Sequence, residues 1–173
     1  MNKIKPNIIN TNRLELHSIN SNDEQLILEI FQSEEVAKTY MLPKFTSVDE
    51  MQKLHHRFIN LSNNLNRFVY GIYYENKLIG FVNDVEMKED FIELGYVINP
   101  RFKSNGFMTE ALKGCIDALN KMGYKTIRCG AFSTNNASLR VMEKAGMHKI
   151  DFTEDINYNN QVYKCIYCEF NNK

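Results

Sequence analysis

Hydrophobic and polar positions along the chain follow two periods, and each period predicts a different element. Residues 12–19 alternate with the period of two that is typical of a half-buried strand. Residues 21–23 then offer side chains that cap helices, ahead of apolar positions at helical spacing. A second amphipathic helix is expected over 48–61, where apolar side chains again recur at helical spacing. The first third of the chain therefore predicts one strand and two helices.

The middle of the chain predicts three consecutive antiparallel strands. Strands are expected over 67–74 and 78–85, and the connection Glu75-Asn76-Lys77 between them is typical of a hairpin. A third strand is expected over 91–98, and Asn99-Pro100 ends it because proline cannot donate a ladder hydrogen bond. This part of the chain contains no helical pattern.

The last third returns to alternating helices and strands. Residues 106–122 carry one continuous apolar stripe and predict a long helix that Gly123 ends. The remaining elements are a strand, a short helix and two final strands, over 126–132, 135–146, 148–155 and 162–170. The whole order predicts a single domain over residues 1–173. Its fold class is α/β (an α+β mixed sheet), with about seven mostly antiparallel strands and four helices on both faces.

Composition and charge exclude several classes of protein. The 173 residues are 43% hydrophobic and 24% charged, which is ordinary globular usage. Lys and Arg number 21, as do Asp and Glu, so the chain lacks the basic excess that nucleic-acid binding requires. No apolar run approaches the ~18 residues of a membrane-spanning helix. The first ten residues lack the apolar segment of a signal peptide. We therefore expect no nucleic acid, no membrane and a cytoplasmic location.

The four cysteines do not predict a disulfide scaffold. Cys115 falls in a predicted helix and Cys129 in a predicted strand, as is typical of buried reduced thiols. Cys165 and Cys168 form a C-x-x-C pattern within a predicted strand, where residues three apart face opposite sides. No second pair of cysteines or histidines follows them, so we expect no metal and no redox role.

The segment that carries the clearest chemistry is the turn before the long helix. A predicted strand ends, Ser104, Asn105 and Gly106 follow, and the helix begins at once. The first turn of a helix leaves its N–H groups unpaired and carries about half a positive charge. Small residues ahead of it would let a phosphate approach the backbone. The pattern alone is more often an ordinary turn, and it is neither a Walker A loop nor a G-x-G-x-x-G loop.

The stretch Asn99-Pro-Arg-Phe-Lys-Ser-Asn-Gly-Phe-Met-Thr-Glu-Ala111 resembles the acetyl-CoA loop of the GNAT N-acetyltransferases, and most of all their RimJ/RimL-like branch. Three further stretches, 11–16, 92–96 and 135–146, match in the right order. The resemblance spans nearly the whole chain. It implies a GNAT-type domain whose central strands splay around the cofactor, and an N-acetyltransferase that uses acetyl-CoA as cosubstrate.

The resemblance also implies the residues that hold acetyl-CoA. In the family's loop pattern Gly106 is retained, Lys103 keeps a cation, and Met108 replaces a small residue. Backbone amides of the loop would bind the pyrophosphate, and Asn135 would contact the pantetheine arm while also capping a helix. The implied cofactor-binding residues are Tyr96, Val97, Ile98, Lys103, Ser104, Asn105, Gly106, Phe107, Met108, Thr109, Asn135 and Ser138.

Glu93 and Ser138 are the candidate catalytic residues. Glu93 lies among apolar neighbours on a predicted strand, where partial burial would raise its carboxyl pKa toward the range useful to a general base. A solvent-facing or ion-paired strand residue is the alternative. The resemblance places Ser138 near the thiol as the acid, because the family's usual tyrosine position here is Met142, which has no proton to donate.

The expected reaction is direct attack of an amine on the thioester in a ternary complex, with an N–H near Val97 stabilising the oxyanion. Cys115 and Cys129 lack the neighbours that would make an acyl-enzyme nucleophile. Water, Tyr96, His55 and His56 are weaker candidates for the base.

The acceptor stays open between a protein N-terminus, as in RimJ/RimL, and a small polyamine or antibiotic-type amine. Residues 40–45 and 156–161 are the expected acceptor loops. Asp151, Glu154 and Asp155 would suit a cationic acceptor, although a solvated acidic edge is more common. The alternative function is a non-catalytic acyl-CoA-binding or sensor protein on the same fold. Either would be a monomer or a homodimer.

Overall fold

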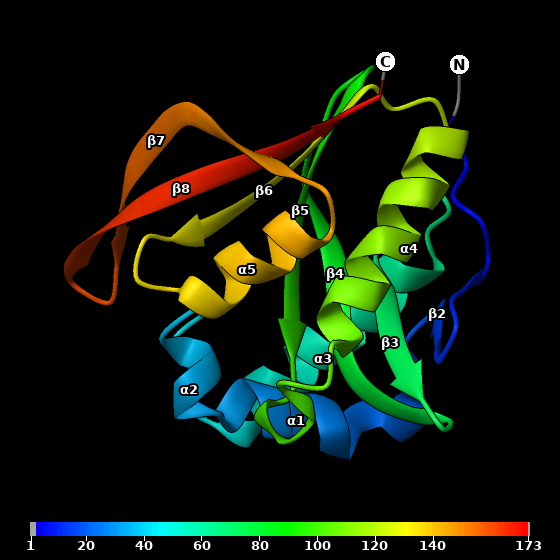
Figure 1. Ribbon diagram of the computed structural model, residues 1–173. Helices are drawn as coiled ribbons and strands as arrows, with labels where there is room; N and C mark the ends of the chain where they lie inside the picture. The colour runs from blue at the N-terminus through cyan, green and yellow to red at the C-terminus, as the bar shows by residue number, and fades with distance from the viewer. Residues whose placement is uncertain (1–2, 173) are drawn as a thin grey trace.

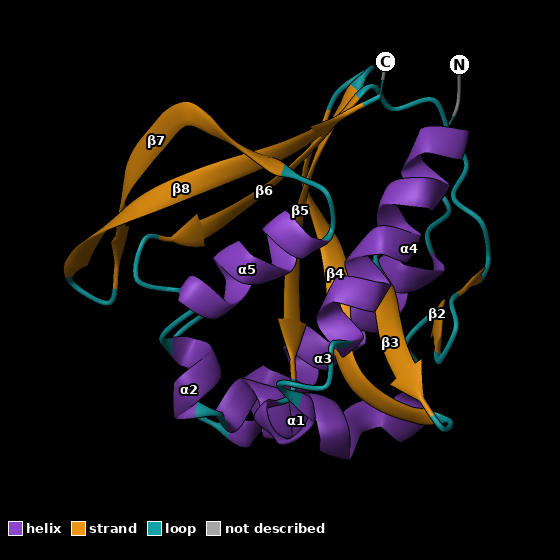
Figure 2. Ribbon diagram, in the orientation of Figure 1, coloured by secondary structure: helices purple, strands orange, loops and turns teal. Residues whose placement is uncertain are grey.

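One mixed sheet organises the chain in the computed structural model, which describes residues 3–172 (Figures 1 and 2). Over these residues the sheet has eight strands in the order β1-β2-β3-β4-β5-β6-β8-β7. The strands are β1 (Ile9–Asn10), β2 (Leu14–His17), β3 (Tyr70–Tyr74), β4 (Lys77–Met87), β5 (Phe91–Ile98), β6 (Thr126–Phe132), β7 (His148–Tyr158) and β8 (Gln161–Asn171). The helices are α1 (Glu24–Gln32), α2 (Glu34–Ala37), α3 (Val48–Asn63), α4 (Phe107–Lys121) and α5 (Asn136–Lys144), with short 3-10 turns η1 (Ser21–Asp23) and η2 (Pro100–Phe102).

Two hydrophobic cores lie on opposite faces of the sheet. The apolar stripe of α4, which includes Leu112 and Cys115, packs against inward-facing residues such as Leu94 and Cys129. On the other face, α1 and α3 pack around Phe81 of β4. The expected mixed sheet with helices on both faces is confirmed.

Most predicted elements appear within a few residues of their expected bounds. Strands β5 and β6 match exactly, and Gly106 is the N-cap of α4 with a φ of 76°. The structure adds β1 and α2, which were not predicted. Both are too short to show a period: β1 has two residues, and α2 is one turn of four residues.

The final hairpin is longer than predicted and extends away from the rest of the sheet, at the left of Figure 1. The expected turn over 157–160 shrinks to Asn159 and Asn160, whose φ values are 51° and 61°. Asparagine tolerates this left-handed conformation better than most residues, so the strands continue to the tip.

The feature that positions the site is the separation of the two central strands. Strands β5 and β6 are parallel and pair only from Phe91–Thr126 to Leu94–Cys129. Beyond that point the two strands diverge, and α4 and α5 begin beside the opening between them (Figure 1). The splayed central strands that the family resemblance implied are therefore present. Within residues 3–172, no helix is both long and apolar enough to cross a membrane.

Candidate active site

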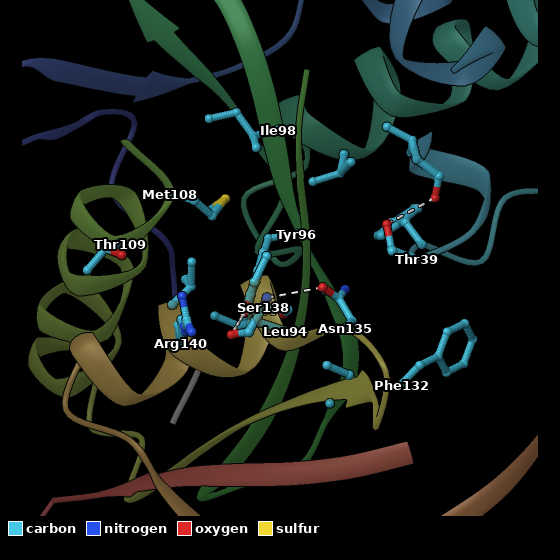
Figure 3. Close-up of a pocket in the computed structure, with 18 of the residues that line it drawn as sticks. Thr39, Leu94, Tyr96, Ile98, Met108, Thr109, Phe132, Asn135, Ser138 and Arg140 are labelled. Atoms are coloured by element: carbon cyan, nitrogen blue, oxygen red, sulfur yellow. Dashed lines mark hydrogen bonds between the residues drawn. The ribbon is translucent and has the colours of Figure 1, made fainter. Parts of the chain in front are cut away.

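A cavity of about 700 Å³ occupies the opening between β5 and β6 (Figure 3). Its helix side is lined by the loop around Gly106, the start of α4 and the start of α5. Its other side, here called the hairpin side, lies toward β4, β8 and the segment after α2. The polar side chains of the hairpin side are Thr39, Tyr40, Asn83, Glu93, Cys165 and Tyr167.

The cavity brings together the residues that the sequence singled out. Both candidate catalytic residues line it, and so does every implied cofactor-binding residue except Asn105. The Asn105 side chain instead donates hydrogen bonds to the backbone oxygens of Phe102 and Lys103, at 3.3 and 2.9 Å. Asn105 thus holds the shape of the turn and does not face the cavity.

The start of α4 presents unpaired backbone donors to the helix side. Among the described residues, no protein acceptor receives a hydrogen bond from the amides of Gly106, Phe107, Met108 or Thr109. The left-handed conformation of Gly106 opens the helix without a side chain in the way. Four free amides at the positive end of a fifteen-residue helix form an anion-binding site of the expected kind.

A network from the N-terminal strand region holds this loop in place. The Glu110 carboxylate in the first turn of α4 accepts hydrogen bonds from Thr11 Oγ1 and from the backbone N–H and Nε of Arg13, at 2.6–2.7 Å. Arg13 also donates to the backbone oxygen of Asn105 and stacks over the ring of Phe107. Burial alone would raise the pKa of Glu110, but these hydrogen bonds outweigh it and lower the pKa. This role of Glu110 was not predicted, because Thr11 and Arg13 are 99 and 97 residues away along the chain.

Cationic side chains gather on the helix side of the cavity. Among the described lining residues, the cations are Lys103, Arg140 and Lys144. Arg140 lies on the same side as Met108 and Thr109, opposite Thr39 and Phe132 (Figure 3). Lys103 differs from the other two because its Nζ pairs with Glu35 Oε1 at 2.5 Å. Arg140 and Lys144 were not predicted. They follow Ser138 on α5, and only the folded structure brings this face of α5 toward the loop around Gly106.

Asn135, Ser138 and Tyr96 form a connected group at the centre of the cavity (Figure 3). Asn135 caps α5 as expected, because its Oδ1 accepts from the backbone N–H of Ser138 at 3.1 Å. The hydroxyls of Ser138 and Tyr96 are 2.7 Å apart, so either can donate to the other. Desolvation raises the pKa of Tyr96 well above its ordinary value. Tyr96 therefore stays protonated at neutral pH and is unsuited to the role of base. Met142 is fully buried in the core.

Glu93 lines the hairpin side without a partner. Among the described residues it has no hydrogen bond or ion pair through its side chain. Arg128, its neighbour across the β5–β6 ladder, instead donates to Glu169 from Nε and Nη2, at 3.0 and 2.7 Å. Partial burial raises the pKa of Glu93; Arg128 opposes this shift, whereas Glu86 and Glu154 reinforce it. Among the described residues, Glu93 is therefore a half-buried carboxylate that is not ion-paired.

The expected acceptor loops meet beside the hairpin side. Tyr158 near the hairpin tip donates to the backbone oxygens of Tyr40 and Leu42, at 3.4 Å each. Ile156 lines the cavity, and Glu154 contacts it indirectly by accepting a hydrogen bond from Tyr167 at 2.5 Å. Asp151 and Asp155 do not line it.

Other sequence candidates lie elsewhere. His55 is a fully buried residue of α3, with Nε2 at 3.1 Å from the backbone oxygen of Asn20, and neither it nor the exposed His56 lines the cavity. Cys115 and Cys129 are buried free thiols. Cys165 lines the cavity on β8, on the face opposite Cys168, and burial raises the pKa of its thiol. Among the described residues, no group of three His, Cys, Asp or Glu residues could hold a metal ion.

Comparison with known proteins agrees with this geometry. A family model described as an acetyltransferase (GNAT) domain matches residues 13–148. An uncharacterized N-acetyltransferase of Bacillus subtilis, YoaA, is 27% identical over 88% of this chain and 89% of its own. Among solved structures, the ribosomal L7/L12 alpha-N-protein acetyltransferase RimL in complex with coenzyme A superposes with a TM-score of 0.81, at 17% identity, covering 95% of this chain and 97% of RimL. The microcin C7 self-immunity acetyltransferase MccE, in complex with acetyl-CoA and AMP, has the same TM-score and identity over 98% of each chain.

Proposed function

Because the chain belongs to the acetyltransferase (GNAT) family, we propose that it transfers the acetyl group of acetyl-CoA to a primary amine, by direct attack in a ternary complex. One observation carries the proposal. A single cavity joins four free helix amides at one end to an unpaired, half-buried carboxylate at the other. The sheet continues through β8, beyond the matched residues, so the proposed domain is the whole chain, 1–173.

Acetyl-CoA would occupy the helix side. The pyrophosphate would accept hydrogen bonds from the amides of residues 106–109, with Arg140 and Lys144 as nearby positive charges. The pantetheine arm would lie in the opening beyond Leu94. There, the backbone N–H of Asn99 donates toward β4, to Ile79, so by strand alternation the amides of Tyr96 and Ile98 point the opposite way, into the opening. The Asn135 Nδ2 remains free for the same arm.

Glu93 would act as the general base. It would take a proton from the acceptor's ammonium group, and the free amine would attack the thioester carbonyl. A C–N bond forms, the C–S bond breaks, and the thiolate leaves. The backbone amides of Tyr96 and Ile98, on either side of Val97, are the donors available to the oxyanion. Ser138 would then protonate the thiolate, with Tyr96 as its hydrogen-bonding partner, and the proton that the new amide nitrogen loses would restore the Ser138 hydroxyl.

Two classes of acceptor fit this proposal. RimL acts, by its title, on a protein N-terminus, and MccE was solved with AMP. The meeting of Tyr158 with the segment after α2 leaves an acceptor site that a peptide end or a small amine could enter.

The test is calorimetry with CoA followed by an acetyl-transfer assay that measures free thiol. Binding of CoA together with thiol release that depends on an added amine would support the proposal. If CoA binds but no amine or N-terminal peptide supports thiol release, catalysis is wrong and binding alone stands. Absence of CoA binding would contradict the proposal altogether.

A further inference from the structure

The described hydroxyl groups on the hairpin side all donate their hydrogens to other protein groups. Tyr40 donates to Asn83 Oδ1 at 2.8 Å, and Tyr167 donates to Glu154 Oε2 at 2.5 Å. Thr39 Oγ1 donates to the backbone oxygens of Glu35 and Val36, at 3.2 and 3.3 Å. A hydroxyl whose hydrogen is engaged can offer a ligand only lone pairs. The Cys165 thiol donates to the backbone oxygen of Ile166 at 4.0 Å, and one hydrogen of Asn83 Nδ2 goes to the Asp84 backbone oxygen. Among the described side chains of the hairpin side, the second hydrogen of Asn83 Nδ2 is the one that remains free.

The charges on the hairpin side also favour a ligand that donates hydrogen bonds and carries positive charge. Among the described lining residues Glu93 is the one carboxylate, and the three cations lie on the helix side. Arg128 lies opposite Glu93 on β6, but its guanidinium is bonded to Glu169 and stacked over Phe91 and Phe152, at 4.8 and 5.2 Å from the ring centroids. A carboxylate or phosphate on the acceptor would therefore meet acceptor oxygens and no free cation.

Tyr167 and Glu154 extend this environment toward the hairpin. The ring of Tyr167 lies flat against Gly130, where a Cβ would approach it to 2.7 Å, so the glycine is what lets the ring form part of the cavity wall. Burial and the hydrogen bond to Glu154 both raise the pKa of Tyr167, which keeps the hydrogen on the tyrosine. Glu154 itself is exposed and keeps its second oxygen free.

We propose that the acceptor is a linear amine with a second positively charged group and no carboxylate or phosphate, bound by Glu93 at the reacting end and by the Tyr167–Glu154 pair at the other. This inference rests on the proposed acetyl transfer to an amine. Across the sheet, β6 lies between Glu93 on β5 and Tyr167 on β8, and Glu154 lies one strand further, on β7. Three strand spacings put the backbones of Glu93 and Glu154 at least roughly 14 Å apart, a span that the two side chains and a linear diamine between them can bridge.

Three acceptors of matched chain length test the charge preference: 1,4-diaminobutane, butylamine and 4-aminobutanoate. They present an ammonium, a methyl and a carboxylate group at the end away from the reacting amine. We expect kcat/KM to fall in that order, with the diamine at least about tenfold better than the amino acid, because one contact is attractive and the other repulsive. Equal rates for the diamine and 4-aminobutanoate would overturn the inference, as would faster turnover of an uncharged N-terminal peptide.

Two variants test whether the charge preference comes from the Tyr167–Glu154 pair. Glu154→Gln can still accept the Tyr167 hydrogen but loses the charge, so the ratio of diamine to butylamine should fall about fivefold, mainly through the KM of the diamine. Tyr167→Phe keeps the ring against Gly130 and should raise the KM for each amine. Asp155→Asn is the matched control, because Asp155 is adjacent to Glu154 on β7 but, among the described residues, has no hydrogen bond to a residue that lines the cavity.

The outcomes separate the two proposals. An unchanged diamine-to-butylamine ratio in Glu154→Gln, or an equal fall in Asp155→Asn, would overturn the inference while acetyl transfer stands. If CoA binds in calorimetry but no amine or peptide supports thiol release, both the proposed acetyl transfer and this inference are wrong.

Discussion

The hydroxyls of Tyr96 and Ser138 lie 2.7 Å apart, although one residue comes from β5 and the other from α5. The contact spans the opening where the two central strands separate, and the Tyr96 hydroxyl also lies 3.3 Å from the backbone oxygen of Ser138. Tyr96 thus holds the start of α5 against β5 at this point. If Ser138 protonates the leaving thiolate, Tyr96 is the residue that orients it.

We therefore expect Tyr96→Phe to lower kcat by about threefold to tenfold, which corresponds to one lost hydrogen bond. Ser138→Ala should lower kcat further, and the double variant should be no slower than Ser138→Ala, because Tyr96 acts through Ser138. The Kd for CoA, measured by calorimetry, is the control and should change little. Additive effects in the double variant would show that Tyr96 does not act through Ser138.

Glu93→Gln should lower kcat/KM by about 10²-fold near neutral pH if the carboxylate is the general base. Burial raises the pKa of Glu93, so the wild-type rate should rise with pH as this group loses its proton. The variant should lack that rise, and its defect should shrink as the pH approaches the acceptor's own pKa, near ~10.4 for an alkylamine. Wild-type rates in the variant from about pH 6 to pH 9 would assign the base to water.

Gly106→Val should weaken CoA binding far more than Lys103→Ala. At a φ of 76°, valine is strained, and its side chain would stand where the phosphate approaches the backbone. Lys103 contributes one partly screened charge that is already paired with Glu35, so its loss should cost less than about fivefold in Kd. Gly106→Asn, which tolerates positive φ, separates the two effects. If Gly106→Asn binds CoA like the wild type, backbone strain alone explains the valine variant.

Glu110→Gln should destabilise the protein and also weaken CoA binding, because Glu110 holds Arg13 and Thr11 against the start of α4. The loss should be roughly 1.5–3 kcal/mol, as for a hydrogen bond to a charged group. The pKa of Glu110 is lowered by folding, so its contribution is present at neutral pH. It is lost as the pH falls below the ordinary value of 4.5 and through the lower folded value. Thermal melts of both proteins from neutral to acidic pH should therefore converge, and a constant difference would contradict this role.

The parts of the site that could be predicted are those encoded locally. Gly106 lies in the turn between a strand and a helix, and Asn135 and Ser138 lie at the start of another helix. The local pattern located these turns, and the family resemblance supplied their roles. Glu93 was found because a carboxylate within an apolar strand is unusual. Each of these residues lies in a strand–turn–helix unit that a short stretch of sequence defines.

The hairpin side could not be predicted, because no short stretch encodes it. Tyr40, Asn83 and Tyr167 are far apart in sequence and meet only through the strand order and register of the sheet. Whether Tyr167 faces the cavity depends on its pairing with Gly130, and a shift of one residue would turn it to the other face. For the same reason the role of Arg13 could not be predicted, because its partner Glu110 is 97 residues away.

The separation of β5 and β6 leaves two backbone edges unpaired inside a folded protein, where edges of this kind would otherwise invite a foreign strand. Helices α4 and α5 restrict access to the gap, so what can pair there is a narrow, extended chain with its own amides. A pantetheine arm is narrow and extended and carries its own amides, so the proposed cosubstrate would act as an additional strand of the sheet. Its resistance to unfolding should then follow the acetyl-CoA pool, by about 2.7 kcal/mol at a hundredfold excess over Kd. In a cell that depletes acetyl-CoA, the protein would lack its proposed cosubstrate and would also be less stable.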